Sequence, residues 1–365
     1  MAATKSLNRR SIGALFRREA REFISMKPSS RPWQFPLAVA VAVGLPVSLG
    51  AALGPMSIAS LAAVGAMAVV YVPRTALVHR AKTLMAVAFA MIVCHALGQF
   101  AQLIPPARVP VIGIVTMFSA LACRYFRIVP PGPLFFVMAT AIGAYAPAQL
   151  GDMPLRLGIF ALGTVGAVLV GCLYSAHILR SRAPQPISPP PPDMAKQTVD
   201  SLTIGAFVAL SLAVAEILAI DKPYWAPVSC LAVIQGLSLR AVWLRQTERI
   251  VGTMLGLGLT WLLLIVAADA WSIAIAIIVL TFCIEAAIVR HYAFATIFIT
   301  PLTILLAEMA FLGDMTGSAL MAARLADTVI GGLAGLLGGA CLHSSALHRA
   351  LIRCLGAGSG ERENG

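Results

Sequence analysis

Charged residues are scarce in this chain, and their scarcity excludes most soluble folds. Asp, Glu, Lys and Arg make up 12% of the 365 residues, whereas hydrophobic residues make up 59%. A typical soluble domain carries about 25% charged and roughly 45–50% apolar residues. A single soluble core cannot bury so much apolar surface, so the composition predicts an all-α membrane protein with no large soluble domain.

Motifs for metal, nucleotide or covalent chemistry are also lacking. The seven cysteines show no metal-ligand spacing, and most fall within apolar runs, where cysteine acts as a small apolar residue. The chain has no His-x-x-x-His pair and no phosphate-binding glycine loop. We therefore expect no cofactor, no bound metal and no enzymatic activity, so any energised transport needs an ion gradient or a separate subunit.

Twelve apolar runs are candidates for membrane spans, because crossing a bilayer takes about 20 apolar residues. The runs 56–72, 109–123 and 224–239 are short, and each fits a tilted helix, a half-helix or a re-entrant segment. Ten to twelve spans are therefore expected. The first six runs are 36–53, 56–72, 83–104, 109–123, 131–148 and 156–177; the second six are 202–220, 224–239, 249–268, 271–289, 291–310 and 322–342.

The basic residues behind the net charge of +12 are distributed as the expected membrane topology requires. With the N-terminus in the cytoplasm, twelve spans place most of the 27 Lys and Arg residues on the cytoplasmic side. This positive-inside distribution predicts a bacterial inner-membrane protein with both termini in the cytoplasm. It explains the charge better than nucleic-acid binding, so no nucleic-acid partner is expected.

The chain divides at a proline-rich segment near its middle. We expect a basic tail at 1–31 with an interfacial helix, a first transmembrane half at 32–182, a linker at 183–199, a second half at 200–345 and a tail at 346–365. The segments 156–177 and 324–345 both open with Arg-Leu and are rich in small residues. Other basic loops recur at a similar offset, which predicts two parallel six-helix repeats.

Three ionisable residues fall within the expected spans, one near mid-depth and two in the outer third of a span, and are candidates for transport or proton coupling. His95 lies near mid-depth, and an imidazole suits proton exchange; alternatively, it is a neutral histidine bonded to a neighbouring helix. Arg324 and Asp327 lie three residues apart, so they share a helix face and can pair. Their alternative role is a structural ion pair.

Two further acidic candidates lie nearer the ends of their helices. Glu216 is close to an outer end, where Lys222 or water can reach it. Glu285 is close to an inner end, near Arg290 and His291, which favours an interfacial position. All the acidic candidates belong to the second half, which we therefore expect to carry any coupling chemistry.

The second half also carries a series of aromatic, glycine and proline motifs. Tyr-Trp-x-Pro opens one run, Arg-x-x-Gly-Thr-x-x-Gly opens the next, and Thr-Pro interrupts a later one. The pattern resembles the fusaric acid resistance (FUSC) family of aromatic acid exporters, whereas the first half resembles it only loosely. The motif residues are Tyr224, Trp225, Pro227, Arg249, Gly252, Thr253, Gly256, Thr300 and Pro301.

The resemblance implies export of small, often aromatic, carboxylates across the inner membrane, in some systems with a periplasmic adaptor protein. Together with the buried ionisable groups, it predicts a proton-coupled secondary exporter of organic acids or related toxic compounds. Protons and membrane lipids are the other expected partners, and a homo-oligomer is possible. The competing hypotheses are a passive anion channel and a non-transporting scaffold subunit.

Overall fold

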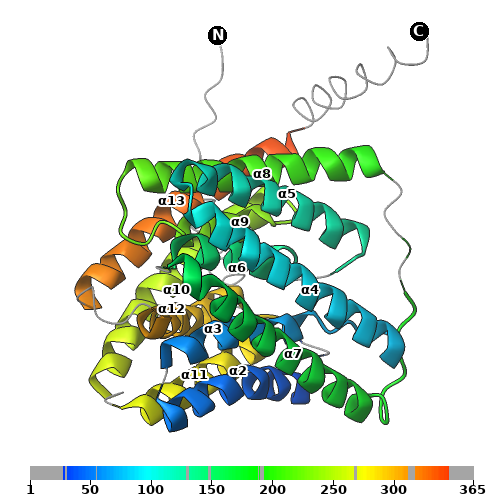
Figure 1. The fold of residues 1–365 in the computed structure, drawn as a ribbon. Coiled ribbons are helices and arrows are strands. Elements are labelled where there is room, and N and C mark those ends of the chain that lie inside the picture. The colour runs from blue at the N-terminus through cyan, green and yellow to red at the C-terminus, as the bar shows by residue number, and fades with distance from the viewer. Residues whose placement is uncertain are drawn as a thin grey trace, which may run out of the picture.

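The computed structural model describes residues 28, 31–54, 56–128, 131–146, 149–187, 189, 193–266, 269–310 and 317–344. The expected interfacial helix of the N-terminal tail and the tail 346–365 lie outside these ranges. Within them the fold is all-α, with α-helices and short 3-10 helices and no strand (Figure 1). The expected fold class is thus confirmed for the described part of the chain.

Each of the twelve apolar runs corresponds to one α-helix, two of them preceded and one followed by a short 3-10 helix. The helices are α2 (Gln34–Leu53), α3 (Met56–Ala66) with η1 (Met67–Tyr71), α4 (Leu77–Gln102), η2 (Pro105–Ala107) with α5 (Arg108–Tyr125), α6 (Leu134–Tyr145), η3 (Leu150–Asp152) with α7 (Met153–Ile178), α8 (Met194–Ile217), α9 (Trp225–Ile234), α10 (Leu239–Val266), α11 (Ala270–Ala287), α12 (Tyr292–Ala310) and α13 (Gly317–His343).

Eight of the described helices are long and apolar enough to cross a membrane, fewer than the ten to twelve expected. The run 109–123 is among them, because η2 extends α5 to Pro105–Tyr125. The shorter apolar helices are α3 with η1, α6, α9 and the described part of α12. Shortness was expected for 56–72 and 224–239. The run 131–148 was wrongly expected to be full length, because α6 has 12 residues, whereas α12 covers Tyr292–Ala310 of the run 291–310.

Local sequence explains where several helices begin and end. Gly54 ends α2 at a φ of 101°, a backbone conformation that favours glycine. Asp193 caps α8 by accepting a hydrogen bond from the Lys196 backbone N–H at 2.9 Å. Asp269 forms a capping box with Ser272 at the start of α11. The carboxylate of Asp269 accepts hydrogen bonds from Ser272, and these hold the pKa of Asp269 below its usual range. The hydrogen bond with the Ser272 side chain has the largest effect.

Small residues let the helix backbones approach closely. A Cβ atom at Gly331 in α13 would lie 2.2 Å from the Ala226 carbonyl oxygen in α9. At Gly163 in α7, a Cβ would lie 2.0 Å from the Ala62 carbonyl oxygen in α3. Each short helix therefore packs its backbone directly against a glycine-rich helix, the kind of contact that small residues provide in membranes.

Corresponding helices pack in corresponding ways. Helix α4 packs on α6 and α7, and α10 packs on α12 and α13, while α3 and α9 pack on α7 and α13. Helix α8 lies beside α5 at one edge of the bundle, and α2 lies beside α11 at the opposite edge (Figure 1). The last two pairings join the first predicted half to the second.

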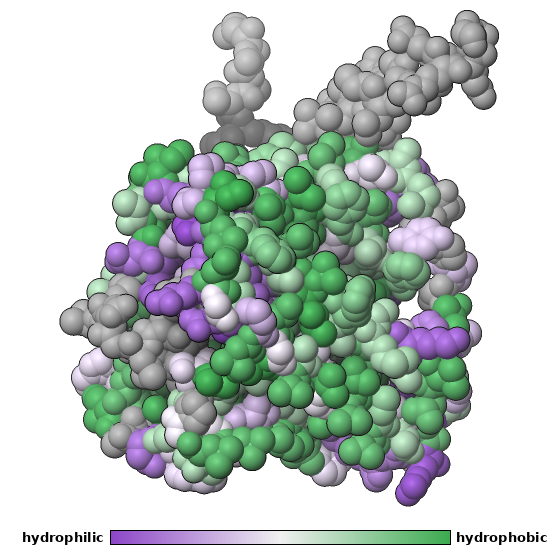
Figure 2. Space-filling view, in the orientation of Figure 1, coloured by the Kyte–Doolittle hydropathy of each residue, from purple (hydrophilic) through white to green (hydrophobic). Residues whose placement is uncertain are grey.

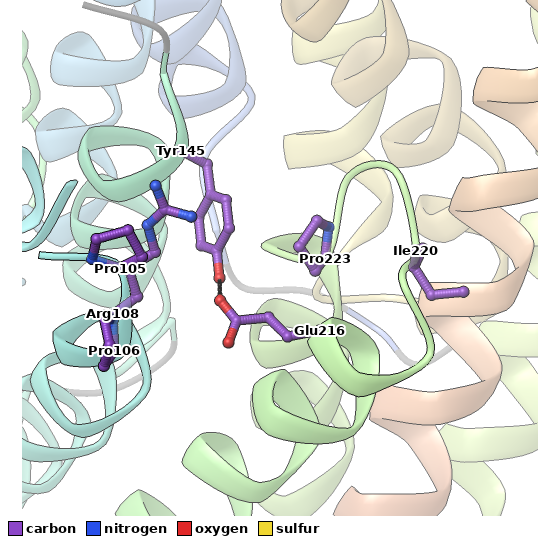
Figure 3. Close-up of a pocket in the computed structure, with 7 residues that line it drawn as sticks. All are labelled: Pro105, Pro106, Arg108, Tyr145, Glu216, Ile220 and Pro223. Carbon is purple, nitrogen blue, oxygen red and sulfur yellow. Dashed lines mark hydrogen bonds between the residues drawn. The ribbon is translucent and has the colours of Figure 1, made fainter.

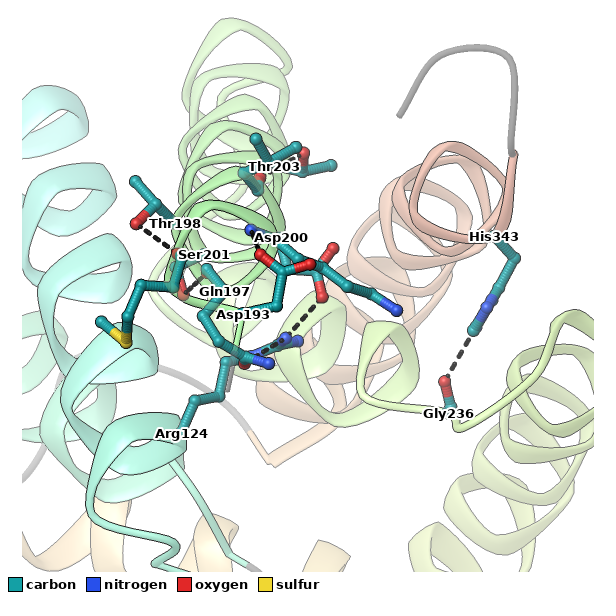
Figure 4. Close-up of polar contacts among 12 residues, drawn as sticks. Arg124, Asp193, Gln197, Thr198, Asp200, Ser201, Thr203, Gly236 and His343 are labelled. Carbon is teal, nitrogen blue, oxygen red and sulfur yellow. Dashed lines mark hydrogen bonds and ion pairs between the residues drawn. The ribbon is translucent and has the colours of Figure 1, made fainter. Parts of the chain in front are cut away.

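Each of these two pairings carries an ion pair between the predicted halves. Arg31, just before α2, bonds Glu285 of α11 at 2.8 Å. Arg124 of α5 bonds Asp200 of α8 at 2.6 Å (Figure 4). Arg31 is the last residue of the predicted N-terminal tail, and Arg124 belongs to the predicted first half, so both basic partners come from the part of the chain before the second half.

The surface fits a membrane environment. Figure 2 shows hydrophobic residues over much of the centre of the visible face, with hydrophilic residues gathered mainly toward its left and right margins. Large apolar side chains such as Phe89, Leu162 and Leu173 are 70% or more exposed. Such exposure is costly in water and favourable in lipid.

Two glycines of one helix provide a matched test of the backbone packing. Replacing Gly163 with alanine should destabilise the protein by about 1–3 kcal/mol, because the added methyl group collides with the α3 backbone. Gly166→Ala is the control, since a Cβ there meets nothing within 4 Å. Thermal unfolding of the purified full-length protein in detergent should show a lower midpoint for Gly163→Ala alone, and equal midpoints would contradict the packing.

Candidate functional site

The most deeply buried charged residues lie in the second half. Arg324 is 3% exposed and Asp327 is 0% exposed, and both project from α13. Neither carboxylate oxygen of Asp327 has a hydrogen-bond partner in the described structure, and neither do Nε and Nη1 of Arg324. A hydrogen-bonded ion pair between these two residues, one of the two alternatives left open by their spacing, is therefore not seen in the described structure.

The guanidinium group of Arg324 lies over an aromatic ring. Its guanidinium carbon lies 4.5 Å from the centroid of a Trp225 ring at the start of α9. A guanidinium over an aromatic face gains a cation–π interaction and keeps its N–H donors available at the edge. Trp225 thus holds the arginine without using up its hydrogen-bonding capacity.

A second arginine completes the cluster. Arg249 of α10 is 3% exposed and donates hydrogen bonds to the Ser229 hydroxyl at 2.8 Å and the Tyr292 hydroxyl at 3.1 Å. It lies close enough to Arg324 for the two charges to interact. Arg249, Arg324 and Asp327 form what we call the α13 cluster, with two positive charges against one negative charge.

A series of aromatic rings connects this cluster to a surface pocket. The ring centroids of Trp225 and Tyr224 are 5.1 Å apart, and those of Tyr224 and Tyr145 are 5.8 Å apart. The guanidinium carbon of Arg108 lies 4.9 Å from the centroid of the Tyr145 ring. The series therefore has an arginine at each end.

The pocket at the far end of the series has a volume of about 390 Å³ and lies between α5, α6 and the end of α8 (Figure 3). The Tyr145 hydroxyl donates a hydrogen bond to Glu216 across it. In the predicted topology this is the periplasmic side. The lining residues are Pro105, Pro106, Arg108, Tyr145, Glu216, Ile220 and Pro223.

The first half has a buried polar group of its own around His95. The imidazole is 0% exposed, donates from Nδ1 to the Ala139 carbonyl at 3.0 Å and stacks on Phe160 with ring centroids 4.4 Å apart. Its Nε2 and the Nε2 of Gln99 have no hydrogen-bond partner in the described structure. One imidazole nitrogen therefore remains able to accept a proton.

Comparison with known proteins finds a family match for part of the chain. Residues 208–338 match the family model described as "Fusaric acid resistance protein-like". This part of the second half is therefore similar to the fusaric acid resistance protein-like family. The resemblance found in the sequence motifs is confirmed over this part of the chain, which includes α9, α10 and most of α13.

One curated relative also matches. The chain is 34% identical over 117 residues to "Uncharacterized membrane protein YvaC" of Bacillus subtilis (strain 168). The match covers 32% of this chain and 18% of that protein, so most of the relative has no counterpart in the alignment. No solved structure matches. The findings support a multi-pass membrane protein with a fusaric acid resistance-like segment.

The family-motif residues prove to be neighbours in the second half. Tyr224 and Trp225 lie at the start of α9 as expected, with Pro227 in its first turn. Gly252 and Gly256 of α10 pack against Thr296 and Thr300 of α12. The remaining motif residues line the same interfaces: Arg249 and Thr253 are buried on α10, and Pro301 lies within α12.

The other predicted site residues are not all brought together. His95 belongs to α4, which packs on α5, α6 and α7, whereas Asp327 belongs to α13, which packs on α8, α9 and α10. Glu216 accepts a hydrogen bond from Tyr145. Glu285 is buried near the end of α11 and paired with Arg31, a partner that its sequence neighbours Arg290 and His291 did not indicate.

Sequence reasoning missed the aromatic partners of the charged residues. Tyr145 and Phe160 each sit in an apolar run with nothing local to mark them. The sequence marks Trp225 only as one residue of a family motif. Their roles depend on which helices become neighbours, and that information is not contained in hydropathy.

Two buried carboxylates provide a test of whether the α13 cluster is structural. Glu285→Gln should lower the free energy of unfolding by about 1–3 kcal/mol, because it breaks a charged hydrogen bond to Arg31. Asp327→Asn should leave stability unchanged or raise it, because the Asp327 carboxylate has no hydrogen bond to lose.

Thermal unfolding of both full-length variants in detergent measures the difference. If Asp327→Asn is destabilised as strongly as Glu285→Gln, then Asp327 has a structural partner and the α13 cluster is not an available site.

Proposed function

We propose that this protein is a proton-coupled secondary transporter that exports small organic acids, with aromatic carboxylates as the favoured class. The observation that carries the proposal is the α13 cluster, where buried charged atoms without hydrogen-bond partners lie at the end of an aromatic series. Charged groups inside a membrane protein are costly and commonly mark a substrate or ion pathway. The fusaric acid resistance-like segment supports the same function.

Charge balance favours an anion as the ligand. Two arginines face one aspartate in the α13 cluster, so one bound carboxylate would neutralise the excess positive charge. The Nε and Nη1 donors of Arg324, which have no described partner, can donate charge-assisted hydrogen bonds to carboxylate oxygens. Trp225 and Tyr224 supply apolar faces against which an aromatic ring can stack.

Proton coupling is assigned to Asp327, with His95 as a second candidate. A buried carboxylate that receives no hydrogen bond is costly in its charged form, so a proton is readily taken up there. His95 keeps one ring nitrogen without a described partner. These two groups lie in different helix groups, and each can be tested by itself.

The proposal includes a bacterial inner-membrane location, cytoplasmic termini and two parallel repeats, α2–α7 and α8–α13. Equivalent packing supports the repeats: α7 lies on α3 and α13 lies on α9, through Gly163 and Gly331. These glycines are separated by the same offset as Arg156 and Arg324. A periplasmic adaptor and self-association remain predictions from the family resemblance.

A growth assay tests the function. A strain that lacks the protein is compared with a complemented strain on a panel of aromatic and aliphatic weak acids, with and without a protonophore. We expect the complemented strain to tolerate certain aromatic acids at several-fold higher concentrations, and this protection to disappear with the protonophore and with Asp327→Asn.

The control is Asp221→Asn, an exposed aspartate in the loop before α9, which should protect as well as the wild type. Protection that survives both the protonophore and Asp327→Asn would favour a passive channel. No protection against any acid would favour a scaffold subunit.

A further inference from the structure

The surface pocket at the end of the aromatic series, which we call the outer pocket, is shared by the two predicted halves. Helices α5 and α6 with η2 line one side, and the end of α8 with the loop after it lines the other (Figure 3). Its volume of about 390 Å³ lies near the lower end of the roughly 300–1,000 Å³ that small-molecule sites occupy. The outer pocket therefore has room for one small organic molecule.

Arg108, the first residue of α5, supplies the outer pocket with a hydrogen-bond donor. Its guanidinium carbon lies 4.9 Å from the centroid of the Tyr145 ring, and Figure 3 shows the two side chains lying against each other. The Nε atom of Arg108 is buried and has no hydrogen-bond partner among the described residues. A guanidinium held on an aromatic face keeps its N–H donors at its edge, so Nε can still donate to a ligand.

The two ends of the aromatic series share one construction. At the inner end the guanidinium of Arg324 lies over Trp225, and at the outer end that of Arg108 lies over Tyr145. In both arginines the Nε atom lacks a partner in the described structure. The same arrangement of donor and aromatic ring favours the same ligand chemistry, a carboxylate that accepts a charge-assisted hydrogen bond.

Tyr145, the last residue of α6, positions this arginine. Its hydroxyl donates a hydrogen bond to Glu216 of α8, and its ring packs against that of Tyr224, just before α9, with the centroids 5.8 Å apart. Contacts from the second half therefore hold the Tyr145 ring, and the ring in turn holds Arg108.

Backbone geometry fixes the apolar walls of the outer pocket. Pro105 and Pro106 open η2, and each proline ring locks its backbone φ. On the other side, Ala219 follows α8 with a φ of 52°, and the Ile220 backbone N–H donates to the Ala215 carbonyl at 3.1 Å, as in a helix-ending turn. Both sides thus present apolar side chains in fixed places, which suits an aromatic ring.

Glu216 gives the outer pocket a negative charge beside the positive one. Among the residues that line it, Arg108 and Glu216 carry one charge of each sign, whereas the α13 cluster has two positive charges against one. An anion is therefore held less tightly in the outer pocket, which suits the release end of an export path. The bond from Tyr145 keeps Glu216 at the hydroxyl end of the ring, so a carboxylate is directed to Arg108.

We propose that the outer pocket is a second binding site for small aromatic carboxylates, from which the exported acid leaves on the periplasmic side. Arg108 binds the carboxylate, Tyr145 positions Arg108, and the proline and isoleucine walls contact the aromatic ring. The inference rests on the proposed export function and deepens it by naming the residues at the exit.

Protection of an introduced cysteine tests the site without requiring transport. Ile220→Cys is labelled with a maleimide in the purified full-length protein in detergent, and the unsubstituted protein gives the background from its own cysteines. Benzoate should slow the labelling several-fold at neutral pH. Acetate, which lacks the ring, and benzyl alcohol, which lacks the charge, should each slow it much less.

Variants of the two charged residues separate binding from structure. In the Ile220→Cys background, Arg108→Gln should abolish the protection by benzoate, and Arg108→Lys, which keeps the charge, should retain part of it. Glu216→Gln removes the opposing charge and should give protection at lower benzoate concentrations. Equal labelling rates without benzoate check that these variants keep the pocket.

The matched control is Leu150→Cys. Leu150 is exposed, lies on the same side of the membrane in the predicted topology and does not line the outer pocket. Benzoate should leave the labelling rate of this cysteine unchanged.

Three results would overturn the proposal: no protection by benzoate, equal protection of Leu150→Cys, and undiminished protection in Arg108→Gln. The outer pocket and the export function can also fail separately. Protection without proton-driven accumulation in vesicles would support the outer pocket and contradict export. Accumulation without protection would support export and overturn the outer pocket.

Discussion

The close contact between α13 and α9 is the constraint on which the candidate site depends. Gly331 leaves no room for a side chain against the Ala226 carbonyl, so the two backbones touch. Arg324, Asp327 and Thr328 lie one and two turns before Gly331 on α13, and the same close approach brings Arg324 over Trp225 at the first residue of α9. A bulkier residue at 331 would separate the helices and remove the aromatic support of the arginine.

Burial determines how the charged groups of the α13 cluster can be stabilised. In water, Arg324 and Asp327 would be hydrated and of little consequence, but in a membrane bundle their charges have few ways to be satisfied. The structure gives Arg249 hydrogen bonds to Ser229 and Tyr292, and it leaves the Arg249 Nε, parts of Arg324 and both oxygens of Asp327 without partners among the described residues. By contrast, Glu285 and Asp200 are each paired with an arginine, and these pairs join helices across the two predicted halves. Paired charges thus hold the bundle together, and the unpaired ones remain available for a ligand or a proton.

Much of the fold was predictable because hydropathy is a local property. All twelve apolar runs correspond to helices, and the motif at Tyr224 and Trp225 does open one. The length of α6 was overestimated, since apolar residues continue past the helix ends into turns. The site was predictable only as a list of residues. Glu285 meets Arg31 across 254 positions of sequence and Glu216 meets Tyr145 across 71, and no local pattern records such partners. The spacing of Arg324 and Asp327 placed both on one helix face, but it did not indicate that the Arg324 guanidinium would lie over Trp225.

Transport by the purified protein is the most direct test of the central claim. Proteoliposomes that contain the full-length protein, with an acidic lumen and a neutral exterior, would be supplied with a labelled aromatic carboxylate. Passive diffusion carries a weak acid away from an acidic lumen, so its accumulation there requires exchange for protons. The account predicts accumulation by the wild type, its collapse with a protonophore and its absence in Arg324→Gln. Equal movement of the label with and without the gradient, or accumulation by Arg324→Gln at the wild-type rate, would contradict it.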